Sequence, residues 1–205
     1  MCNLYRMDRA GSEVAKLFGT IGAAPTANVP AEIYPGYPGL VVAGGELRSM
    51  VWGFPLAMKS KRTGALLKPR PVNNTRSDKL DSFMWRYSFA ERRCLIPITE
   101  FAEAEGPAGA KTRSWFTLPD QAIFAAAGIW RETDEWGSAY SMVMTEADGV
   151  VATVHDRMPV LLHQDDWRRW TDGSVEEARG LCTPYRGAMA IRRTDELWTA
   201  RRNAP

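Results

Sequence analysis

The sequence predicts an α+β fold, built from a mainly antiparallel, curved or barrel-like sheet system with a few peripheral helices. Short apolar runs with the length of strands recur along the chain. The gaps between them have the length of hairpin turns, which favours antiparallel pairing over βαβ units. Helical periodicity is confined to a few short stretches. With 205 residues, 45% hydrophobic side chains and no internal repeat or linker, the chain suits a single domain over residues 1–205.

Helices are predicted at three places. Residues 11–19 form the first, with Ser12 as candidate N-cap and Gly19 as its end. In the second, apolar residues recur at the i, i+3, i+4 and i+7 positions of one helix face. These residues are Leu80, Phe83, Met84 and Tyr87. The last helix begins at the capping box of residues 174–177.

The strands are predicted from apolar runs bounded by turn residues. We expect them at residues 40–43, 49–52, 94–98, 115–118, 123–129 and 140–145. The first two are joined through Gly44 and Gly45. The repeated prolines between Pro25 and Pro38 predict an extended, irregular crossing instead.

Composition excludes several classes of protein. No stretch approaches the roughly 18 apolar residues of a membrane-spanning helix, and the first residues lack the apolar run of a signal sequence. We therefore expect no membrane partner and a cytoplasmic location. Cys2, Cys94 and Cys182 are too far apart for a CxxC pair, and only two histidines are present, so we expect no metal site and no disulfide framework. No glycine-rich phosphate loop, dinucleotide fingerprint or GxSxG elbow occurs, and we expect no cofactor.

The net charge of +2 is too small for a bulk polyanion binder, but the cations are unevenly distributed. The segment 59–70, here called the basic run, contains no acid. Its cations are Lys59, Lys61, Arg62, Lys68 and Arg70. We interpret the basic run as the phosphate-facing edge of a groove. The arginine pairs at 92–93, 168–169, 192–193 and 201–202 are more simply interpreted as solvated loops.

A cysteine directly follows the initiator methionine. If Met1 is removed, Cys2 carries a free α-amine beside its thiol. An α-amine has a pKa of about 7.7–8.0, against about 10.4 for lysine, so a useful fraction is neutral and nucleophilic at pH 7. The amine can form an imine with an aldehyde, and the sulfur can then attack the same carbon. Closure of this five-membered thiazolidine ring is open only to an N-terminal cysteine.

Such chemistry needs proton transfer, for which carboxylates and histidine are suited. The candidates are Asn74, the acids Glu100, Glu103 and Glu105, and His155. Each has a simpler interpretation: Asn74 as a turn or cap residue, the acids as a solvated hairpin, and His155 as a structural histidine.

Six segments in order resemble one family. They are Met1-Cys2, Trp52-Gly53-Phe54, Asn74-Thr75-Arg76-Ser77-Asp78, Arg92-Arg93-Cys94-Leu95-Ile96-Pro97, Thr145-Glu146-Ala147 and His155-Asp156-Arg157-Met158-Pro159. From Cys2 to about Arg193 the chain resembles the SOS response-associated peptidase (SRAP) family, whose members crosslink themselves to abasic sites in single-stranded DNA.

The resemblance implies a function and a set of site residues. Met1 would be removed by autoproteolysis, and Cys2 would attack the ring-opened deoxyribose. Asn74, Glu103 and His155 match the family's other catalytic residues, with His155 assisting opening of the sugar ring and release of the crosslink. The residues that match positions near the DNA are Pro35, Arg76, Phe101 and Thr145. The implied partner is single-stranded DNA containing abasic sites, and a monomer suits this task.

The chain departs from the family pattern in three places. Cys2-Asn3-Leu4 replaces Cys-Gly-Arg, so a DNA-contacting arginine is missing unless Arg6 substitutes. The run 98–104, Ile-Thr-Glu-Phe-Ala-Glu-Ala, replaces Ala-Asp-Gly-Phe-Tyr-Glu-Trp. Met58 lies near the position of a tryptophan that wedges against bases.

Two other functions stay open at this point. An N-terminal-cysteine peptidase or amidohydrolase would use Glu103 and His155 as base and orienting residue. A noncatalytic single-strand binding module would leave Cys2 without a role.

Overall fold

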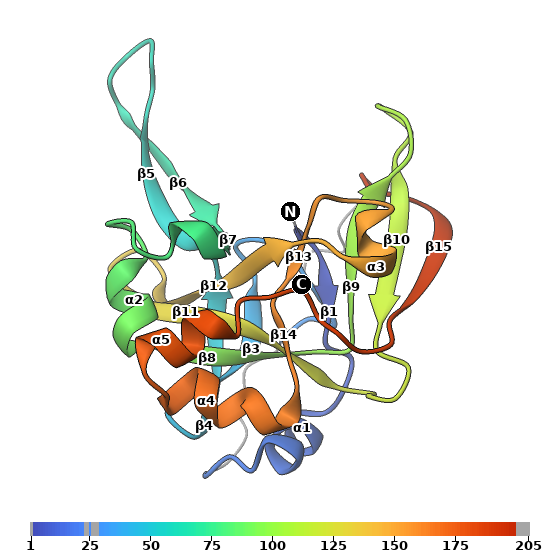
Figure 1. The fold of residues 1–205 in the computed structure, drawn as a ribbon. Helices are drawn as coiled ribbons and strands as arrows, with labels where there is room; N and C mark the ends of the chain where they lie inside the picture. Colours follow the sequence, from blue (N-terminus) through green and yellow to red (C-terminus); the bar gives the residue numbers. More distant parts are fainter. Residues whose placement is uncertain (1, 23–24, 26–28, 200–205) are drawn as a thin grey trace.

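Antiparallel strands dominate the computed structural model, which describes residues 2–22, 25 and 29–199 (Figure 1). The strands are β1 (Tyr5–Arg6), β2 (Glu32–Ile33), β3 (Pro38–Ala43), β4 (Glu46–Trp52), β5 (Phe54–Lys59), β6 (Leu66–Val72), β7 (Asn74–Arg76), β8 (Arg93–Ile98), β9 (Glu100–Glu105), β10 (Thr112–Thr117), β11 (Phe124–Thr133), β12 (Gly137–Glu146), β13 (Arg157–Pro159), β14 (Leu161–Leu162) and β15 (Ala190–Leu197). The helices are α1 (Gly11–Phe18), α2 (Arg86–Glu91), α3 (Gly149–Ala152), α4 (Trp167–Asp172) and α5 (Val175–Gly180), with 3₁₀ turns η1 (Ser77–Lys79) and η2 (Gln164–Asp166). None of these helices is long and apolar enough to cross a membrane.

A closed barrel lies at the centre of the described chain. Its strands follow the order β12-β4-β3-β8-β11, and pairing of β11 with β12 closes the ring. All neighbours are antiparallel except β12 and β4. Trp52, Ile96 and Tyr140 are fully buried in its core. The predicted α+β class with a barrel-like sheet is thereby confirmed, and all six predicted strands are found with shifted or extended ends.

A second sheet contains β1, the first strand of the chain. Its order is β15-β10-β9-β1-β2. Only Thr99 separates β8 of the barrel from β9 of this sheet, so one continuous stretch of chain links the two sheets. Tyr5 in β1 pairs with Phe101 in β9 and with Ile33 in β2. The segment 25–38, expected to be irregular, contains β2 and the first residue of β3; its residues 26–28 lie outside the described residues.

Two of the three predicted helices are confirmed. Helix α1 ends at Gly19, which adopts the left-handed conformation at φ 61°. Its N-cap is Ala10, not Ser12, and no side chain caps it. Helix α5 begins at Ser174 with both hydrogen bonds of the capping box to Glu177.

The helix predicted from the spacing of residues 80–87 is wrong. Leu80 is fully buried, but Phe83 and Tyr87 are 81% and 63% exposed, so these positions do not form one buried face. The side chains that pack in the core are Trp85 and Phe89, and the helix that forms is the later α2. Apolar periodicity predicts a helix only when the periodic side chains are the buried ones.

One member of the arginine pairs is structural, which corrects the solvated-loop interpretation for that residue. Arg93 is 8% exposed and donates to the carbonyls of Phe89 and Ala90 in α2. It also donates to the carbonyls of Trp170 and Gly173 at the end of α4. A single guanidinium thus satisfies carbonyl groups at the C-terminal ends of two helices.

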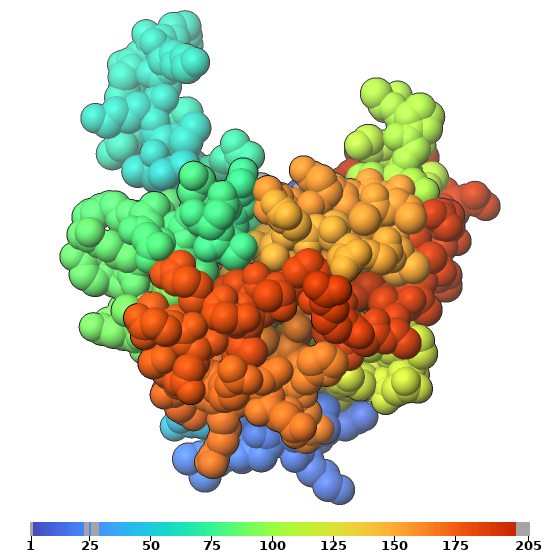
Figure 2. All heavy atoms as spheres, viewed as in Figure 1, coloured from blue at the N-terminus to red at the C-terminus, as the bar shows by residue number. Residues whose placement is uncertain are grey.

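The basic run forms a hairpin that the sequence did not predict. Strands β5 and β6 pair only with each other, and the hairpin projects from the body of the protein (Figure 1). The hairpin of β9 and β10 projects on the other side, and the space-filling view shows a saddle between the two projections (Figure 2).

Candidate active site

Cys2 is fully buried at the start of β1, and two asparagines hold its backbone. Its carbonyl oxygen accepts hydrogen bonds from Nδ2 of Asn73 at 3.0 Å and Nδ2 of Asn74 at 2.6 Å. The N–H of Ala102 in β9 donates to the carbonyl of Leu4 at 2.9 Å. These bonds fix the N-terminal segment between β7 and β9.

The Trp-Gly-Phe segment positions the asparagine pair. Nε1 of Trp52 donates to the carbonyl of Asn73 at 2.9 Å, and the N–H of Met142 donates to the same carbonyl at 2.9 Å. Gly53 has φ 124°, and a Cβ there would lie 2.5 Å from Cβ of Pro71, so only glycine fits. Asn73 was missed by sequence reasoning, although its place beside Asn74 was a signal.

Glu103 lies beside Cys2. It is 2% exposed in β9, opposite Ser114 of β10. Burial raises the pKa of Glu103 to about 7. Burial also raises the pKa of the Cys2 thiol far above its usual range, and the negative charge of Glu103 raises it further. The carboxyl group is therefore close enough to interact with the thiol and is poised to gain or lose a proton near neutral pH.

His155 follows α3 and is half-buried. Its Nδ1 accepts a hydrogen bond from the N–H of Arg157 at 2.9 Å and lies 3.0 Å from Oδ1 of Asp156. Burial lowers the pKa of His155 and outweighs the opposite effect of Asp156. The ring is therefore neutral at pH 7, and its proton is carried on Nε2 because Nδ1 is an acceptor.

Two charged side chains, Asp156 and Lys111, affect the pKa of both Glu103 and His155. Besides burial, Asp156 raises the pKa of both groups and Lys111 lowers it in both. Glu103 and His155 are therefore subject to the same two charges. Lys111, in the turn between β9 and β10, was not predicted, because no motif contains it.

The residues predicted near DNA are not all on the surface. Arg76 is exposed in β7 and paired with Asp78 at 2.7 Å. Thr145 is 4% exposed, and its Oγ1 donates to the carbonyl of Cys182 at 3.3 Å. Pro35 is partly exposed and lines a cavity beside Asn3.

Phe101 is the most deeply placed of these residues. It is fully buried and stacks on Phe116 at 5.0 Å between ring centroids. A contact between Phe101 and DNA stays a prediction, for which this conformation offers no exposed surface.

Arg6 does not replace the missing family arginine. Its guanidinium is 4.0 Å from the ring of Trp115 and pairs with Glu32 and Glu100, each at 2.6 Å. Glu105 pairs with Arg193 at 2.9 Å. Of the three candidate acids, Glu103 is therefore the one beside Cys2, and Glu100 and Glu105 neutralise arginines.

The projecting hairpin combines cations with exposed apolar side chains. Its exposed residues include the five cations of the basic run and Leu56, Met58, Leu66 and Leu67. Within the described residues, no carboxylate lies within ion-pair distance of these cations. The hairpin thus offers both phosphate contacts and apolar surface for bases.

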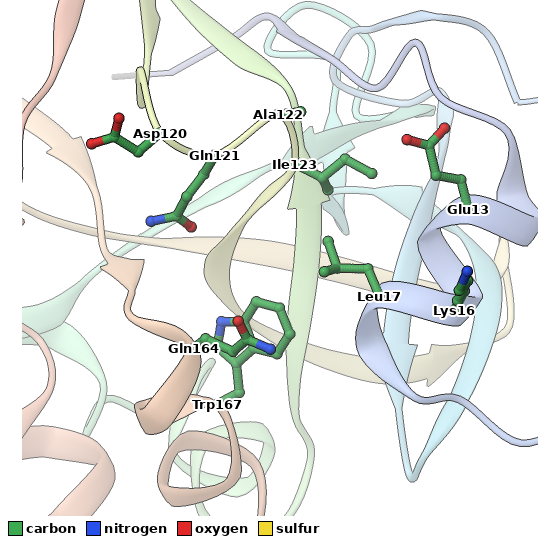
Figure 3. Close-up of a pocket in the computed structure, with 9 residues that line it drawn as sticks. All are labelled: Glu13, Lys16, Leu17, Asp120, Gln121, Ala122, Ile123, Gln164 and Trp167. Atoms are coloured by element: carbon green, nitrogen blue, oxygen red, sulfur yellow. The ribbon is translucent and has the colours of Figure 1, made fainter.

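A larger cavity of about 750 Å³ is lined by none of the predicted site residues (Figure 3). Side chains from α1, η2, α4 and the β10–β11 turn line it, and α1 and α4 lie at the opposite end of the barrel from the two projecting hairpins (Figure 1). The residues that line the cavity are Glu13, Lys16, Leu17, Asp120, Gln121, Ala122, Ile123, Gln164 and Trp167. Because it contains none of the predicted site residues, its size alone does not make it the active site. Within the described part of the chain, no cluster of three or more His, Cys, Asp or Glu residues could hold a metal ion.

Comparison with known proteins identifies the family. Residues 1–197 match the family described as SOS response associated peptidase (SRAP). The chain belongs to this family. It is 26% identical over 171 residues to the abasic site processing protein YoaM of Bacillus subtilis (strain 168), which covers 79% of this chain and 71% of that protein.

Solved structures share the fold of this SRAP chain. A protein from Bordetella bronchiseptica has a TM-score of 0.79 and 23% identity, covering 94% of this chain and 99% of that one. A protein from Bacteroides thetaiotaomicron has a TM-score of 0.77 and 19% identity, covering 94% and 91%.

Proposed function

We propose that this protein processes abasic sites in single-stranded DNA by forming a covalent thiazolidine link through Cys2. One observation carries the proposal: Cys2 is held by Asn73 and Asn74 and interacts with a buried carboxyl group, Glu103, whose pKa is about 7. Membership of the SRAP family and the likeness to an abasic site processing protein support it.

The first step is removal of Met1, which lies outside the described residues. It leaves the α-amine of Cys2 free while both asparagines still bind the carbonyl of the same residue. Oδ1 of Asn74 is buried and has no hydrogen-bond partner among the described residues. It is thus available to accept a hydrogen bond from the new amine or from a sugar hydroxyl.

The second step opens the sugar. An abasic deoxyribose is mostly a cyclic hemiacetal, and its ring oxygen needs a proton as the bond to C1′ breaks. His155, neutral with its proton on Nε2, is the donor we assign to this step. The C1′ hydroxyl gives its proton to a solvent water in the same step, which yields the aldehyde.

The third step forms the link. The neutral amine of Cys2 attacks C1′, and Glu103 carries two protons in turn from nitrogen to the former aldehyde oxygen. The first gives the carbinolamine hydroxyl, and the second lets it leave as water, so an imine remains. Sγ then adds to C1′ while its proton passes, through Glu103, to nitrogen. The balance is one aldehyde and one aminothiol converted to one thiazolidine and one water, without any redox change.

The projecting hairpin and the saddle beside it would bind the strand. Cations on the hairpin contact phosphates, and its exposed Leu56, Met58, Leu66 and Leu67 contact unpaired bases. One copy of the chain supplies every group used here, so we propose a monomer.

Two measurements test this function. Intact mass of the purified protein should show loss of one methionine. A single-stranded oligonucleotide with one abasic site should give an adduct that survives denaturation, whereas the same strand with a tetrahydrofuran residue, which has no aldehyde, should give none. Retention of Met1 would contradict the proposal. Cleavage of peptides in trans without any DNA adduct would support the peptidase alternative instead.

Replacing Lys59, Lys61 and Arg62 by glutamine should weaken the salt dependence of binding. Each lost phosphate contact lowers the slope of log K against log salt by about 0.7 for a single strand, so the triple variant should lose about 2. Fluorescence anisotropy with the tetrahydrofuran strand measures the slope. Arg168→Gln, an exposed change on α4, is the matched control and should keep it. An unchanged slope in the triple variant would remove the hairpin from the DNA interface.

A further inference from the structure

A small cavity lies beside Asn3, the residue that follows Cys2. Its volume is about 140 Å³, and Asn3, Tyr34, Pro35 and Trp198 are among the residues that line it. Trp198 follows β15, one residue beyond the part of the chain that matches the family. No motif or comparison therefore assigns a role to it.

Hydrogen bonds connect the wall of the cavity with the backbone of Cys2. Nδ2 of Asn73 donates both to the carbonyl of Cys2 at 3.0 Å and to Oδ1 of Asn3 at 3.1 Å. Consecutive Cα atoms are about 3.8 Å apart, so the wall formed by Asn3 begins one residue from the reacting sulfur and nitrogen. The cavity wall and the backbone of Cys2 thus share one hydrogen-bond donor, Asn73.

Trp198 is fixed to the site through Lys111. The N–H of Trp198 donates to the carbonyl of Lys111 at 2.8 Å, and its partly buried ring packs against a cluster that contains Leu4 and Trp115. The charge of Lys111 reaches both Glu103 and His155. In the described residues, no carboxylate lies within ion-pair distance of Lys111, whose side chain is exposed.

We propose that Trp198 and Lys111 form a subsite for the nucleotide next to the lesion, with its base stacked on Trp198 inside the cavity and its phosphate on Lys111. This inference rests on the proposed function. The cavity is smaller than the roughly 300–1,000 Å³ of typical ligand sites, which suits one flat ring and not a whole nucleotide. Stacking on an aromatic ring tolerates any base, as a lesion sensor requires.

The test uses 2-aminopurine placed 5′ or 3′ of a tetrahydrofuran residue in single-stranded DNA. Stacking on tryptophan quenches this fluorescent base. We expect quenching at one of the two positions with the unmodified protein and its loss in Trp198→Ala, together with weakening of binding by about 5- to 100-fold. Trp198→Phe, which keeps an aromatic ring on the cluster, should restore most of the quenching. Lys111→Gln should lower the salt slope by about 0.7.

The matched control is Tyr87→Ala, which removes an exposed aromatic ring on α2, on the other side of the molecule from β15 (Figure 1). It should leave the quenching unchanged. Equal quenching in the unmodified protein and in both Trp198 variants would overturn the subsite. Because the tetrahydrofuran strand cannot crosslink, this outcome is separate from failure of the proposed function, which appears as a missing adduct with the abasic strand.

Discussion

Cys2→Ala should abolish the denaturation-resistant adduct with abasic DNA. Alanine keeps the α-amine but has no sulfur, so any imine that forms stays open to hydrolysis. The carbonyl at position 2 keeps its hydrogen bonds from Asn73 and Asn74, because these contact the backbone. The measurement is the fraction of labelled oligonucleotide shifted in a denaturing gel, and we expect no stable shift.

Cys2→Ser separates the roles of nitrogen and sulfur. The amine still forms an imine, which can lead to strand cleavage by β-elimination, but oxygen closes only a weaker ring. We therefore expect cleaved strand with little stable adduct. Cys182→Ala is the matched control, because this half-buried thiol follows α5, donates to the carbonyl of Ala178 and packs against the core, and the control should crosslink normally. A normal adduct yield from Cys2→Ala would refute the assignment of the nucleophile.

Glu103→Gln should slow crosslinking by about 10²- to 10⁴-fold, the usual contribution of a general acid–base group. Glutamine keeps the size of the side chain and one acceptor oxygen, but it cannot exchange a proton. Single-turnover rates with excess protein measure the effect. Glu105→Gln is the matched control, since Glu105 lies in the same strand but pairs with Arg193. A similar loss in both variants would assign Glu103 a structural role.

The pH dependence of the crosslinking rate further distinguishes a catalytic role of Glu103 from a structural one. In the unmodified protein both the amine and Glu103, with a pKa of about 7, have to lose a proton. The logarithm of the rate should therefore fall with a slope of about two per pH unit below pH 6, and with a slope of about one in Glu103→Gln. Identical slopes would contradict proton transfer by Glu103.

Stability gives an independent check of the buried acid. Burial raises the pKa of Glu103 from 4.5 to about 7, so the folded state holds this proton more tightly than the unfolded state. Ionising the buried carboxyl group therefore lowers the free energy of unfolding. This loss is absent below about pH 4.5, grows as the pH rises and is complete above pH 7, at up to about 3 kcal/mol. Between pH 4 and pH 8, Glu103→Gln should therefore gain free energy of unfolding relative to the unmodified protein by up to this amount, as measured by urea unfolding.

Local patterns predicted strands better than helices in this chain. Strand β8 is buried along its whole length and is apolar after Arg93, so the sequence contains most of its signal. The helix predicted from the apolar spacing of residues 80–87 was wrong, because Phe83 is exposed and Trp85 is buried. Which of these side chains is buried depends on the position of the barrel. Hairpin β5–β6 was missed because its two strands are mostly exposed and lack the apolar alternation of a half-buried strand.

The residues of the candidate site were also predicted only in part. Cys2, Asn74, Glu103 and His155 belong to recognisable motifs. Asn74 donates to the carbonyl of Cys2, and the charge of Glu103 raises the pKa of the Cys2 thiol. Lys111 was missed because it belongs to no motif and influences the site only through space.

By itself, the sequence identified the family and the group that we propose to be reactive. An aminothiol at position 2 depends only on chain order, and so does the run of motifs that follows it. Only the tertiary structure decided which acid serves that group. Glu100, Glu103 and Glu105 are chemically alike, but the pairing of β1, β9 and β10 buries Glu103 beside Cys2 and leaves its neighbours to arginines. Burial, which exists only in the folded protein, brings the pKa of Glu103 to the pH at which it can transfer a proton.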